Sequence, residues 1–500
     1  MDWKKLQNGS DIRGVALDGV KNEPVNLTFE TVKTIGQAFA IWLKKYYPNT
    51  THLKVAVGMD SRLSGPDMER ALSEGILSQG IDVFDFGLAS TPAIFMSTKI
   101  GDEKMLGGVM ITASHLPFNR NGLKFFTIDG GLDKKDITEI LEMAENENFP
   151  KSERGVSCKM NFMNVYSNYL ANFIRSEVDC KKDYALPLKG LKIVVDAGNG
   201  AGGFYAENVL KPLGADVSDS QFLETDGNFP NHVPNPEDDT AMASIVKKVI
   251  ESKADLGIIF DTDVDRMALV SSKGEPINRN ALIALISAIV LENHQNTTIV
   301  TDSITSNGLS IFINEHLKGK HHRFKRGYKN VINEAVRLNE SGEPCWLAIE
   351  TSGHAALKEN YFLDDGAYLA AKVVITMAKM KQKGKSLTSL IENLTIPLES
   401  REFRININDC DFKKYGEKII SDLEKFVATK KGWQISPENY EGIRVNCKTD
   451  NEKGWFLLRL SLHDPVMPLN VESDVKNGVE NITNQVFEFL KQYKELDFKK

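Results

Sequence analysis

Short apolar runs that end in Asp or Gly alternate along this chain with longer amphipathic stretches, and this alternation most limits the possible fold. Four of the runs have the character of buried strands: LKVAVGMD (53–60), LKIVVDAGNG (191–200), ADLGIIFDTD (254–263) and TIVTDS (298–303). Helical patterns lie between them, for example in 27–47 and 238–252. Buried strands separated by helices are typical of βαβ units with mainly parallel sheets. The sequence therefore predicts an α/β fold.

The strand–turn–helix pattern restarts near residues 53, 191 and 298, whereas the last hundred residues differ. There, three strand-like segments precede a helical tail at 475–496, which indicates an antiparallel sheet with helices: FRININD (403–409), IRVNC (443–447) and GWFLLRLSLH (454–463). A length of 500 residues suits three or four domains. We expect three similar mixed α/β domains and a C-terminal α+β domain, with the boundaries 1–155, 156–275, 276–395 and 396–500.

Composition narrows the class of protein and its partners. The chain is 41% hydrophobic and 26% charged, and its formal net charge of −7 argues against nucleic-acid binding, which usually needs a basic face. The five cysteines are far apart and form no CxxC pair, which is typical of a reducing cytoplasm. The first residues, MDWKKLQNGSDIRG, lack the apolar core of a signal peptide, and no stretch approaches a membrane span. We expect a cytoplasmic protein without a membrane partner.

An acidic motif, DTDVDR (261–266), directly follows the predicted strand ADLGIIF. Asp261, Asp263 and Asp265 would lie together at the carboxyl end of that strand, where ligands bind in α/β sheets. Three such close carboxylates repel one another unless a cation neutralises them, and hard oxygen ligands favour Mg²⁺. A solvated acidic turn is the alternative. Arg266, next in the chain, suits a phosphate bound beside the metal.

A second motif, TASHLP (112–117), places Ser114 next to His115 between an apolar run and a polar turn. On the hexapeptide alone, a serine that caps a helix or closes a turn is the commoner explanation, because such serines greatly outnumber nucleophiles. The choice between a loop serine and a nucleophile therefore depends on the rest of the chain.

Several weaker motifs complete the set. IETSGH (349–354), followed by the acidic DDG (364–366), could bind sugar hydroxyls through Glu350 and Ser352, or could be an ordinary turn. The C-terminal strands carry Arg444, Arg459, Ser461 and His463, which could form an anion site. Arg459 and Ser461 are two apart on a predicted strand and would share one face. GMDSRLS (58–64) and VVDAGNGAGG (194–203) are strand-to-helix turns that lack the spacing of a nucleotide-binding loop.

Taken in chain order, these motifs resemble the α-D-phosphohexomutase family. The resemblance runs from DIRG (11–14) through TASHLP, VVDAGNGAGG, DGNFPNHVPNPE (226–237), DTDVDR and ETSGH to the C-terminal R-x-S segment. Within the family it is greatest for the bacterial phosphomannomutase/phosphoglucomutase group. The resemblance implies three α/β domains and one domain of TATA-box-like fold around a central cleft.

The resemblance also implies a role for each motif. Ser114 matches the serine that carries a phosphate, and together with Asp261, Asp263 and Asp265 it would hold Mg²⁺. Lys124 matches a residue of general acid–base catalysis, with Arg13, His115 and Arg266 close to the reacting phosphate. The remaining matches concern substrate binding: Lys325, Glu350, Ser352 and His354 for the sugar, and Arg444, Arg459, Ser461 and His463 for the distal phosphate.

A phosphohexomutase moves a phosphoryl group between C1 and C6 of a hexose. An enzyme phosphate is chemically necessary for this reaction, because the group cannot pass directly between the two carbons. The enzyme phosphate goes to one end, and the resulting sugar 1,6-bisphosphate turns over and returns the phosphate from its other end. Cationic groups and Mg²⁺ stabilise the charge that develops during transfer. The sequence therefore predicts an intramolecular phosphotransferase of mannose or glucose phosphates.

Three departures from the family pattern bear on this prediction. Leu116 replaces a common Asn in the serine loop, and Thr262 with Val264 replaces non-ligand residues of the metal loop. The distal segment reads RLSLHDP, so Leu462 and His463 replace an amide or glycine and a hydroxyl of the family pattern, and Asp464 adds a negative charge. A phosphoglucosamine or phosphopentose mutase, or a non-catalytic protein that binds sugar phosphates, stays open as an alternative. The expected oligomeric state is a monomer or a homodimer.

Overall fold

The computed structural model describes residues 2–409, 411–461 and 464–498. The chain forms two compact units, each built from two stretches of sequence. The first unit combines Met1–Asn278 with Ser352–Ser389, and the second combines Arg279–Thr351 with Leu390–Lys500. Among the described helices, none is both long enough and apolar enough to cross a membrane.

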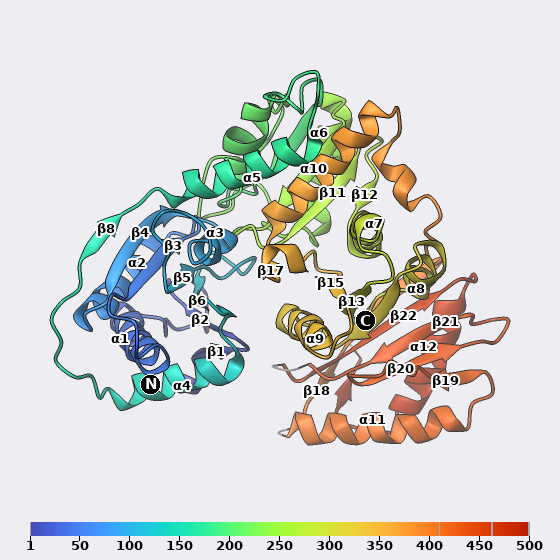
Figure 1. Cartoon of the computed structure of the whole chain (residues 1–500). Coiled ribbons are helices and arrows are strands. Elements are labelled where there is room, and N and C mark those ends of the chain that lie inside the picture. The colour runs from blue at the N-terminus through green and yellow to red at the C-terminus, as the bar shows by residue number, and fades with distance from the viewer. Residues whose placement is uncertain (1, 410, 462–463, 499–500) are drawn as a thin grey trace. The chain divides into compact units, whose positions relative to one another are not determined.

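The N-terminal part of the first unit is a mixed sheet with helices (Figure 1). Its strand order is β1-β2-β6-β5-β3-β4-β8, with β7 paired to β6. Strands β5, β3, β4 and β8 run parallel, whereas β6 and β2 are antiparallel to their neighbours. The strands are β1 (Gln7–Asn8), β2 (Asp11–Val15), β3 (Lys54–Met59), β4 (Asp82–Leu88), β5 (Gly107–Ile111), β6 (Arg120–Thr127), β7 (Gly130–Gly131) and β8 (Ser157–Lys159).

The helices of this part cover the sheet and bury a common core that includes Phe39, Val57 and Val109. They are α1 (Phe29–Tyr46), α2 (Gly65–Ser78), α3 (Thr91–Met96) and α4 (Lys134–Asn146), after a short 3-10 helix at Trp3–Leu6. Thr28 begins α1 by accepting a hydrogen bond from the backbone of Thr31, as is usual for a helix N-cap.

The rest of the first unit contains a second sheet of order β12-β11-β10-β9. Strands β9 and β10 are parallel, and β11 returns antiparallel to β10. The strands are β9 (Ile193–Asp196), β10 (Leu256–Phe260), β11 (Met267–Ser271) and β12 (Pro276–Ile277). The same unit also contains β16 (Ala355–Leu357) and β17 (Leu363–Asp364), which pair antiparallel with each other. The helices are α5 (Phe162–Val178), α6 (Asp239–Ser252) and α10 (Gly366–Gln382), with a π-helix at Tyr205–Leu210 and 3-10 helices at Lys211–Leu213 and Lys358–Asn360.

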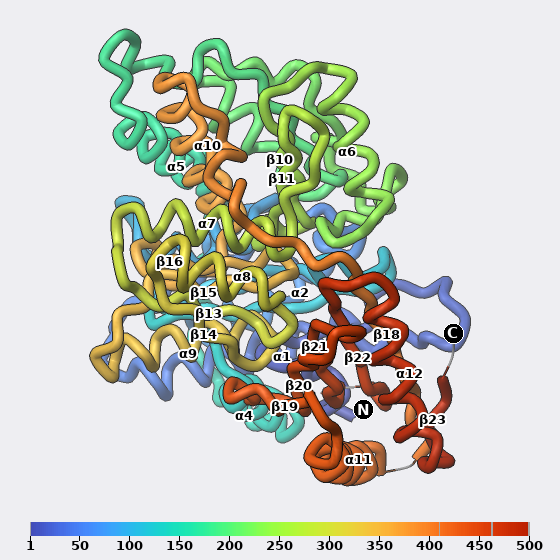
Figure 2. The backbone as a smooth tube through the Cα atoms, turned by 90° about the vertical axis from the view of Figure 1, so that its right-hand side faces the viewer, coloured from blue at the N-terminus to red at the C-terminus, as the bar shows by residue number. Residues whose placement is uncertain are grey.

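The second unit begins with three parallel strands, with β13 between β14 and β15 (Figure 2). These strands are β13 (Thr298–Asp302), β14 (Lys320–Phe324) and β15 (Cys345–Ile349). Their helices are α7 (Arg279–Asn293), α8 (Asn307–Ile311) and α9 (Tyr328–Glu340), with a π-helix at Phe312–His316. A 3-10 helix at Leu387–Ile391 spans the division between the two units.

The C-terminal part of the second unit is an antiparallel sheet of order β19-β20-β21-β22-β18-β23. Its strands are β18 (Glu399–Ile407), β19 (Trp433–Ile435), β20 (Ile443–Cys447), β21 (Gly454–Leu458), β22 (Val466–Ser473) and β23 (Leu496–Asp497). Helices α11 (Phe412–Ala428) and α12 (Gly478–Leu490) share one apolar core with the sheet. The predicted α/β architecture with a different, antiparallel C-terminal part is therefore confirmed.

One strand is shorter than the sequence predicts. We expected a strand across 454–463, but β21 ends at Leu458, before Arg459 and Ser461. The pairing does not stop abruptly, since Arg459 N donates to Pro468 O (3.1 Å) and Ser461 N to Val466 O (2.9 Å). Both residues thus keep the same orientation toward β22, although they lie in the connection after the regular strand.

Candidate active site

A buried polar centre lies in the first unit where β5, β6 and β10 meet two loops. The serine loop follows β5 and contains Ser114, whose residue is 3% exposed. The aspartate loop, 261–266, joins β10 to β11, and its three carboxylates are at most 1% exposed. Because both loops leave the ends of buried strands, their side chains are held by rigid elements.

The three aspartates form a compact set of oxygen ligands. The ligand atoms of Asp261, Asp263 and Asp265 all lie within 4.8 Å of one another. Thr91, the first residue of α3, donates to Asp263 Oδ2 (2.5 Å). Asp263 Oδ1 and Asp265 Oδ1 are buried and have no hydrogen-bond partner among the described residues. Buried carboxylate oxygens without a donor are suited to a cation, and an all-oxygen set fits Mg²⁺.

The electrostatics of the aspartate loop agree with a cation site. Burial, together with the charge of Asp265, raises the pKa of Asp261 well above its usual range. Burial alone would also raise the pKa of Asp265, but the positive charges of Lys124, His354 and Arg266 hold it below its usual range. Close carboxylates in a buried loop resist joint ionisation, and a divalent cation would remove that resistance.

Close backbone packing shapes this loop. Val264 has a φ of 67°, which is unusual for a β-branched residue. Gly366 N donates to Val264 O (3.1 Å), and Ala201 N donates to Thr262 O (2.8 Å). A Cβ at Gly200 would lie 2.7 Å from the backbone of Thr262, so only glycine allows this approach. The VVDAGNGAGG motif thus supports the aspartate loop.

Ser114 lies against the aspartates in a strained conformation. Its φ is 51°, which is the left-handed region that non-glycine residues rarely adopt. Its Oγ donates to Asp261 Oδ2 (2.9 Å) and accepts from Arg266 Nη2 (3.1 Å). Strained residues of this kind persist where the surrounding structure holds them, and they are frequent at functional sites.

Three cationic side chains belong to this centre: Lys124, Arg266 and Arg13. Lys124, on β6, is 4% exposed and forms ion pairs with Asp265 and, at 3.2 Å, with Asp263. Arg266 is 2% exposed, and its Nε donates to Asp261 Oδ2 (3.0 Å). Arg13, on β2, pairs with Asp11 (3.0 Å). Its positive charge contributes to the low pKa of His115.

Two of the three predicted histidines, His115 and His354, lie in opposite electrostatic settings. Burial and the nearby Arg266 lower the pKa of His115 to about 2, so this ring is neutral and its Nδ1 lies 2.7 Å from Arg266 Nη2. Burial alone would lower the pKa of His354, but Asp364 and Asp265 raise it to about 9. Asp364 hydrogen-bonds to His354 Nδ1. Sequence reasoning noted the DDG motif but gave Asp364 no role.

The first unit thus brings together six of the predicted side chains besides the three aspartates: Arg13, Ser114, His115, Lys124, Arg266 and His354. Ser352 also belongs to this unit, and its Oγ is buried without a hydrogen-bond partner among the described residues. Five predicted residues that the structure describes belong to the second unit: Lys325, Glu350, Arg444, Arg459 and Ser461.

In the second unit, the predicted sugar residues have different surroundings. Glu350 is 3% exposed, and its Oε1 accepts from Gly327 N (2.6 Å). Lys325 is exposed and lies over the ring of Phe324. The neighbouring Arg326 has its Nε 3.9 Å from Asp302 Oδ2. Sequence reasoning chose Lys325 and missed Arg326, and the FKRGYK motif alone does not decide which cation turns inward.

Arg444 has a different setting from the anion site that the sequence predicts. The residue is 2% exposed, and its guanidinium donates to Ser303 O (2.7 Å) and Thr305 O (3.0 Å). It also lies over the ring of Trp455, at 3.6 Å from the centroid. The Nη atoms of Arg444 therefore fasten β20 to the loop after β13, whereas its Nε is buried without a hydrogen-bond partner among the described residues.

The predicted distal phosphate segment is partly described. Arg459 is half-buried, and burial lowers the pKa of its guanidinium. Its Nε has no hydrogen-bond partner among the described residues. Ser461 Oγ accepts from Asp464 N (3.3 Å), and Asp464 is exposed. His463 lies outside the described residues.

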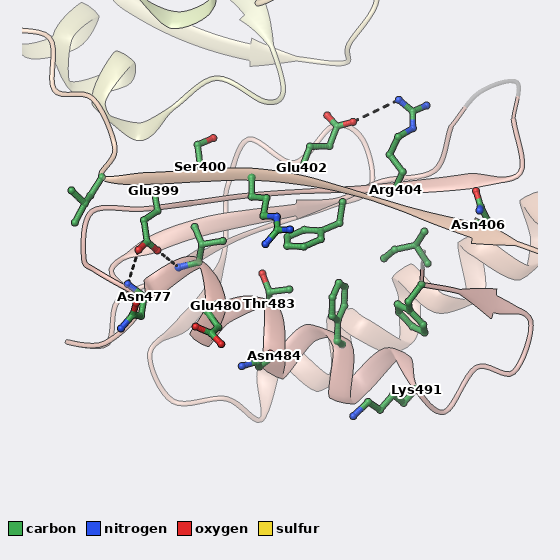
Figure 3. A pocket seen from close by; sticks show the side chains of 17 residues that line it. Glu399, Ser400, Glu402, Arg404, Asn406, Asn477, Glu480, Thr483, Asn484 and Lys491 are labelled. Carbon is green, nitrogen blue, oxygen red and sulfur yellow. Dashed lines mark hydrogen bonds and ion pairs between the residues drawn. The ribbon is translucent and has the colours of Figure 1, made fainter. Parts of the chain in front are cut away.

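A large groove elsewhere in the second unit is separate from these residues. It has a volume of about 1320 Å³ and lies between β18 and α12 (Figure 3). Figure 3 shows Ser400, Glu402 and Arg404 on the side of β18 that faces away from α12. None of the predicted catalytic or binding residues lines this groove in the described part of the chain.

Comparisons with known proteins agree with this arrangement. Three domains described as phosphoglucomutase/phosphomannomutase, alpha/beta/alpha domains I, II and III, match residues 4–151, 164–274 and 278–396. A phosphomannomutase/phosphoglucomutase of Pseudomonas syringae pv. tomato is 33% identical over 94% of this chain and 92% of its own length. A phosphoglucomutase/phosphomannomutase of Thermococcus kodakarensis is 30% identical over 91% of this chain and 92% of its own.

A solved structure extends the likeness to the whole fold. The crystal structure of a phosphoglucomutase/phosphomannomutase family protein from Burkholderia thailandensis has a TM-score of 0.78 and 25% identity, and covers 97% of this chain and 96% of the other. These matches define the class of protein as a sugar phosphate mutase. The chain belongs to the phosphoglucomutase/phosphomannomutase family of α-D-phosphohexomutases. The family resemblance and the class of activity, an intramolecular phosphotransferase of hexose phosphates, are confirmed.

Proposed function

We propose that this protein interconverts hexose 1-phosphates and hexose 6-phosphates of mannose, glucose or both, with Ser114 as the phosphate carrier. The observation that carries the proposal is the setting of Ser114 in the first unit. Its Oγ lies in a strained turn between Asp261 and the guanidinium of Arg266. An ordinary capping serine needs neither the strain nor the buried cation.

The metal in this proposal is Mg²⁺, held by Asp261, Asp263, Asp265 and the phosphate on Ser114. The two buried carboxylate oxygens without donors support it, as does the all-oxygen ligand set. When bound, Mg²⁺ would neutralise part of the charge on the phosphate during transfer. Magnesium dependence is general in this family.

The chain's own residues then divide the chemistry. In the first half-reaction the bond between phosphorus and Ser114 Oγ breaks, a bond to a sugar hydroxyl oxygen forms, and that hydroxyl loses its proton. The bonding electron pair stays on Ser114 Oγ, which is proposed to take a proton from the ammonium group of Lys124, and the resulting neutral amine then receives the proton of the sugar hydroxyl. Arg266 donates hydrogen bonds where charge develops. The second half-reaction reverses these steps at the other end of the sugar 1,6-bisphosphate, which restores the phosphate on Ser114.

Substrate recognition is proposed for the residues that the family resemblance assigns to it. Glu350, Ser352 and His354 would bind the sugar, and Lys325 or its neighbour Arg326 would add positive charge. Arg459 and Ser461 would bind the phosphate that is not reacting, supported by the Arg459 Nε that has no partner in the described part of the chain. The same reaction needs no nucleic acid or membrane, and we place it in the cytoplasm, in a monomer or homodimer.

Two measurements test this function. The intact mass of the purified protein should show one phosphate that is lost on phosphatase treatment and maps to Ser114. Turnover of glucose 1-phosphate, mannose 1-phosphate and glucosamine 1-phosphate should then be assayed side by side with Mg²⁺. Preference for the amino sugar would redirect the proposal to a phosphoglucosamine mutase. Absence of both phosphate and turnover would instead favour a non-catalytic binding protein.

A further inference from the structure

Arg62 of the GMDSRLS motif is a buried arginine close to the proposed site, and the mechanism above does not use it. The residue is 1% exposed and lies between β3 and α2. Its Nε forms an ion pair with Asp60 Oδ2 at 3.3 Å. A buried cation beside a buried carboxylate needs further hydrogen bonds to be stable. The acceptors of those bonds therefore indicate what Arg62 does.

All of these acceptors belong to the serine loop. Arg62 Nη2 donates to the carbonyl oxygens of Ser114 and Leu116, the second at 2.7 Å. Its Nη1 donates to the carbonyl oxygens of Pro117 (2.8 Å) and Arg120 (2.9 Å). A planar guanidinium can hold several carbonyls in fixed directions, which an ammonium group cannot do. One side chain thus fixes the path of the whole loop.

The N–H group of Ser114 is held from the same motif. Ser114 N donates to Thr112 Oγ1 (2.9 Å), and Thr112 Oγ1 donates to Asp60 Oδ2 (2.6 Å). The carbonyl of Ser114 is held by Arg62, as described above. Both backbone polar groups of the strained serine are therefore fixed by Asp60 and Arg62, either directly or through one hydroxyl. These hydrogen bonds to both backbone groups explain how a non-glycine residue keeps a φ of 51°.

A second unassigned motif, DGNFPNHVPNPE, packs against Arg62. A Cβ at Gly227 would lie 2.6 Å from Ser61 O and Leu63 N, so only glycine allows the two backbones to approach this closely. The Arg62 guanidinium carbon lies 5.4 Å from the ring centroid of Phe229. The same segment places Asn235 Oδ1 3.3 Å from Arg266 Nη1. It therefore supports both of the arginines that contact Ser114.

We propose that Arg62, braced by the Gly227–Phe229 segment, is a positioning residue that holds Ser114 in its left-handed conformation so that Oγ faces Asp261. This inference rests on the proposed role of Ser114 as phosphate carrier. It assigns the GMDSRLS and DGNFPNHVPNPE motifs to the phosphoryl-transfer step. Arg62 contacts the loop and not the substrate, so its loss should slow transfer without weakening substrate binding.

The variants Arg62→Lys and Gly227→Ala test this role. Lysine keeps the positive charge opposite Asp60 but cannot hold four carbonyls at once. Arg62→Lys should lower kcat by about 10- to 100-fold and leave KM within about threefold, the pattern of a loss in the transition state only. Gly227→Ala should also lower kcat, by about 3- to 10-fold. Arg70→Lys, on the exposed face of helix α2, which begins three residues after Arg62, is the matched control and should change neither value.

The decisive readout is single-turnover transfer of phosphate from radiolabelled phosphoenzyme to glucose 1-phosphate. The rate should fall by the same factor as kcat in both variants, while melting curves show a folded protein. A folded Arg62→Lys variant with wild-type transfer would overturn the inference, and so would losses that only follow the folded fraction. If Arg62→Lys does not fold, the transfer rate of Gly227→Ala decides in the same way.

The two proposals fail differently. If wild-type protein carries phosphate on Ser114 and both variants transfer it normally, only the positioning role is wrong. If wild-type Ser114 carries no phosphate and Ser114→Ala is fully active, the proposed function fails and the positioning role fails with it.

Discussion

Two buried arginines, Arg266 in the first unit and Arg444 in the second, use their guanidinium groups for different purposes. In the first unit, Arg266 donates to the side chains of Asp261 and Ser114, which are groups that can react or bind a cation. In the second unit, Arg444 donates to the backbone carbonyls of Ser303 and Thr305. An arginine that donates to backbone carbonyls holds two chain segments together, whereas one that donates to reactive side chains is suited to a role in catalysis. The partners, and not the burial, distinguish the two roles.

Arg459 stands between these two cases. It is half-buried, and its Nε has no hydrogen-bond partner within the described part of the chain. The Nε of Arg444 also lacks a partner there, so Arg459 differs from Arg444 in being half-buried rather than buried.

The largest effect is expected for Ser114→Ala. Removal of the phosphate carrier should lower mutase activity by at least about 10²-fold, the usual size of a lost catalytic group. Steady-state assays with glucose 1-phosphate measure it. Ser176→Ala, an exposed serine of α5, is the control. A smaller loss in Ser114→Ala would return Ser114 to the class of loop serines.

Asp263→Asn should follow, with about a 10- to 100-fold loss of activity and a requirement for more Mg²⁺. The substitution removes one ligand charge from the aspartate loop but keeps a similar shape, so the melting temperature should hold. Titration of activity with Mg²⁺ measures the change, and the exposed Asp102→Asn is the control. Full activity of Asp263→Asn at limiting Mg²⁺ would mean that the loop is only a polar turn.

Arg459→Ala should raise KM for glucose 1-phosphate and glucose 6-phosphate together by about 10- to 100-fold. A hydrogen bond to a charged group is worth roughly 1.5–3 kcal/mol, and each phosphate should occupy this site once per cycle. Kinetics in both directions measure the effect, with the exposed Arg404→Ala as control. Impairment of only one direction would mean that Arg459 does not serve both orientations.

Arg444→Met should instead lower stability and leave catalysis almost unchanged. The buried carbonyls of Ser303 and Thr305 would lose their charged donor, at a cost of about 3–5 kcal/mol. Chemical denaturation measures the loss, and kinetic constants per folded molecule should stay within about threefold of wild type. A stable variant with a strongly raised KM would show that Arg444 binds substrate, as the sequence predicts.

The smallest effect on activity is expected for Glu472→Gln. Burial raises the pKa of Glu472 to about 7, although Trp455 Nε1 donates to it (2.8 Å) and Arg444 is near. The folded state therefore binds this proton more tightly than the unfolded chain between about pH 4.5 and 7. The unfolding free energy should fall by about 1–3 kcal/mol as pH rises through that window. Denaturation at pH 5 and pH 8 should show a flatter dependence in Glu472→Gln, and an unchanged slope would contradict this.

The alternation of apolar runs was sufficient to predict the main elements. Strands expected near residues 53, 191 and 298 are found as β3, β9 and β13, and the helix expected at 27–47 is α1, Phe29–Tyr46. These elements are local patterns of burial, which residue order fixes directly. The aspartate loop was equally accessible, because its three carboxylates occupy every second position of one short motif that follows a predicted strand.

Residues whose roles depend on distant partners were not accessible in this way. Arg62 and Ser114 are 52 positions apart, yet one holds the backbone of the other. Arg444 is a residue type that often binds anions. Only its contact with Ser303 and Thr305, about 140 positions away, shows how its Nη donors are used. The sequence alone determined the family, the α/β domains, and the serine and aspartate motifs, because these depend on neighbouring residues. The tertiary structure decided which backbone carbonyls Arg62 and Arg444 hold, because a donor's role is set by the acceptors that folding brings to it.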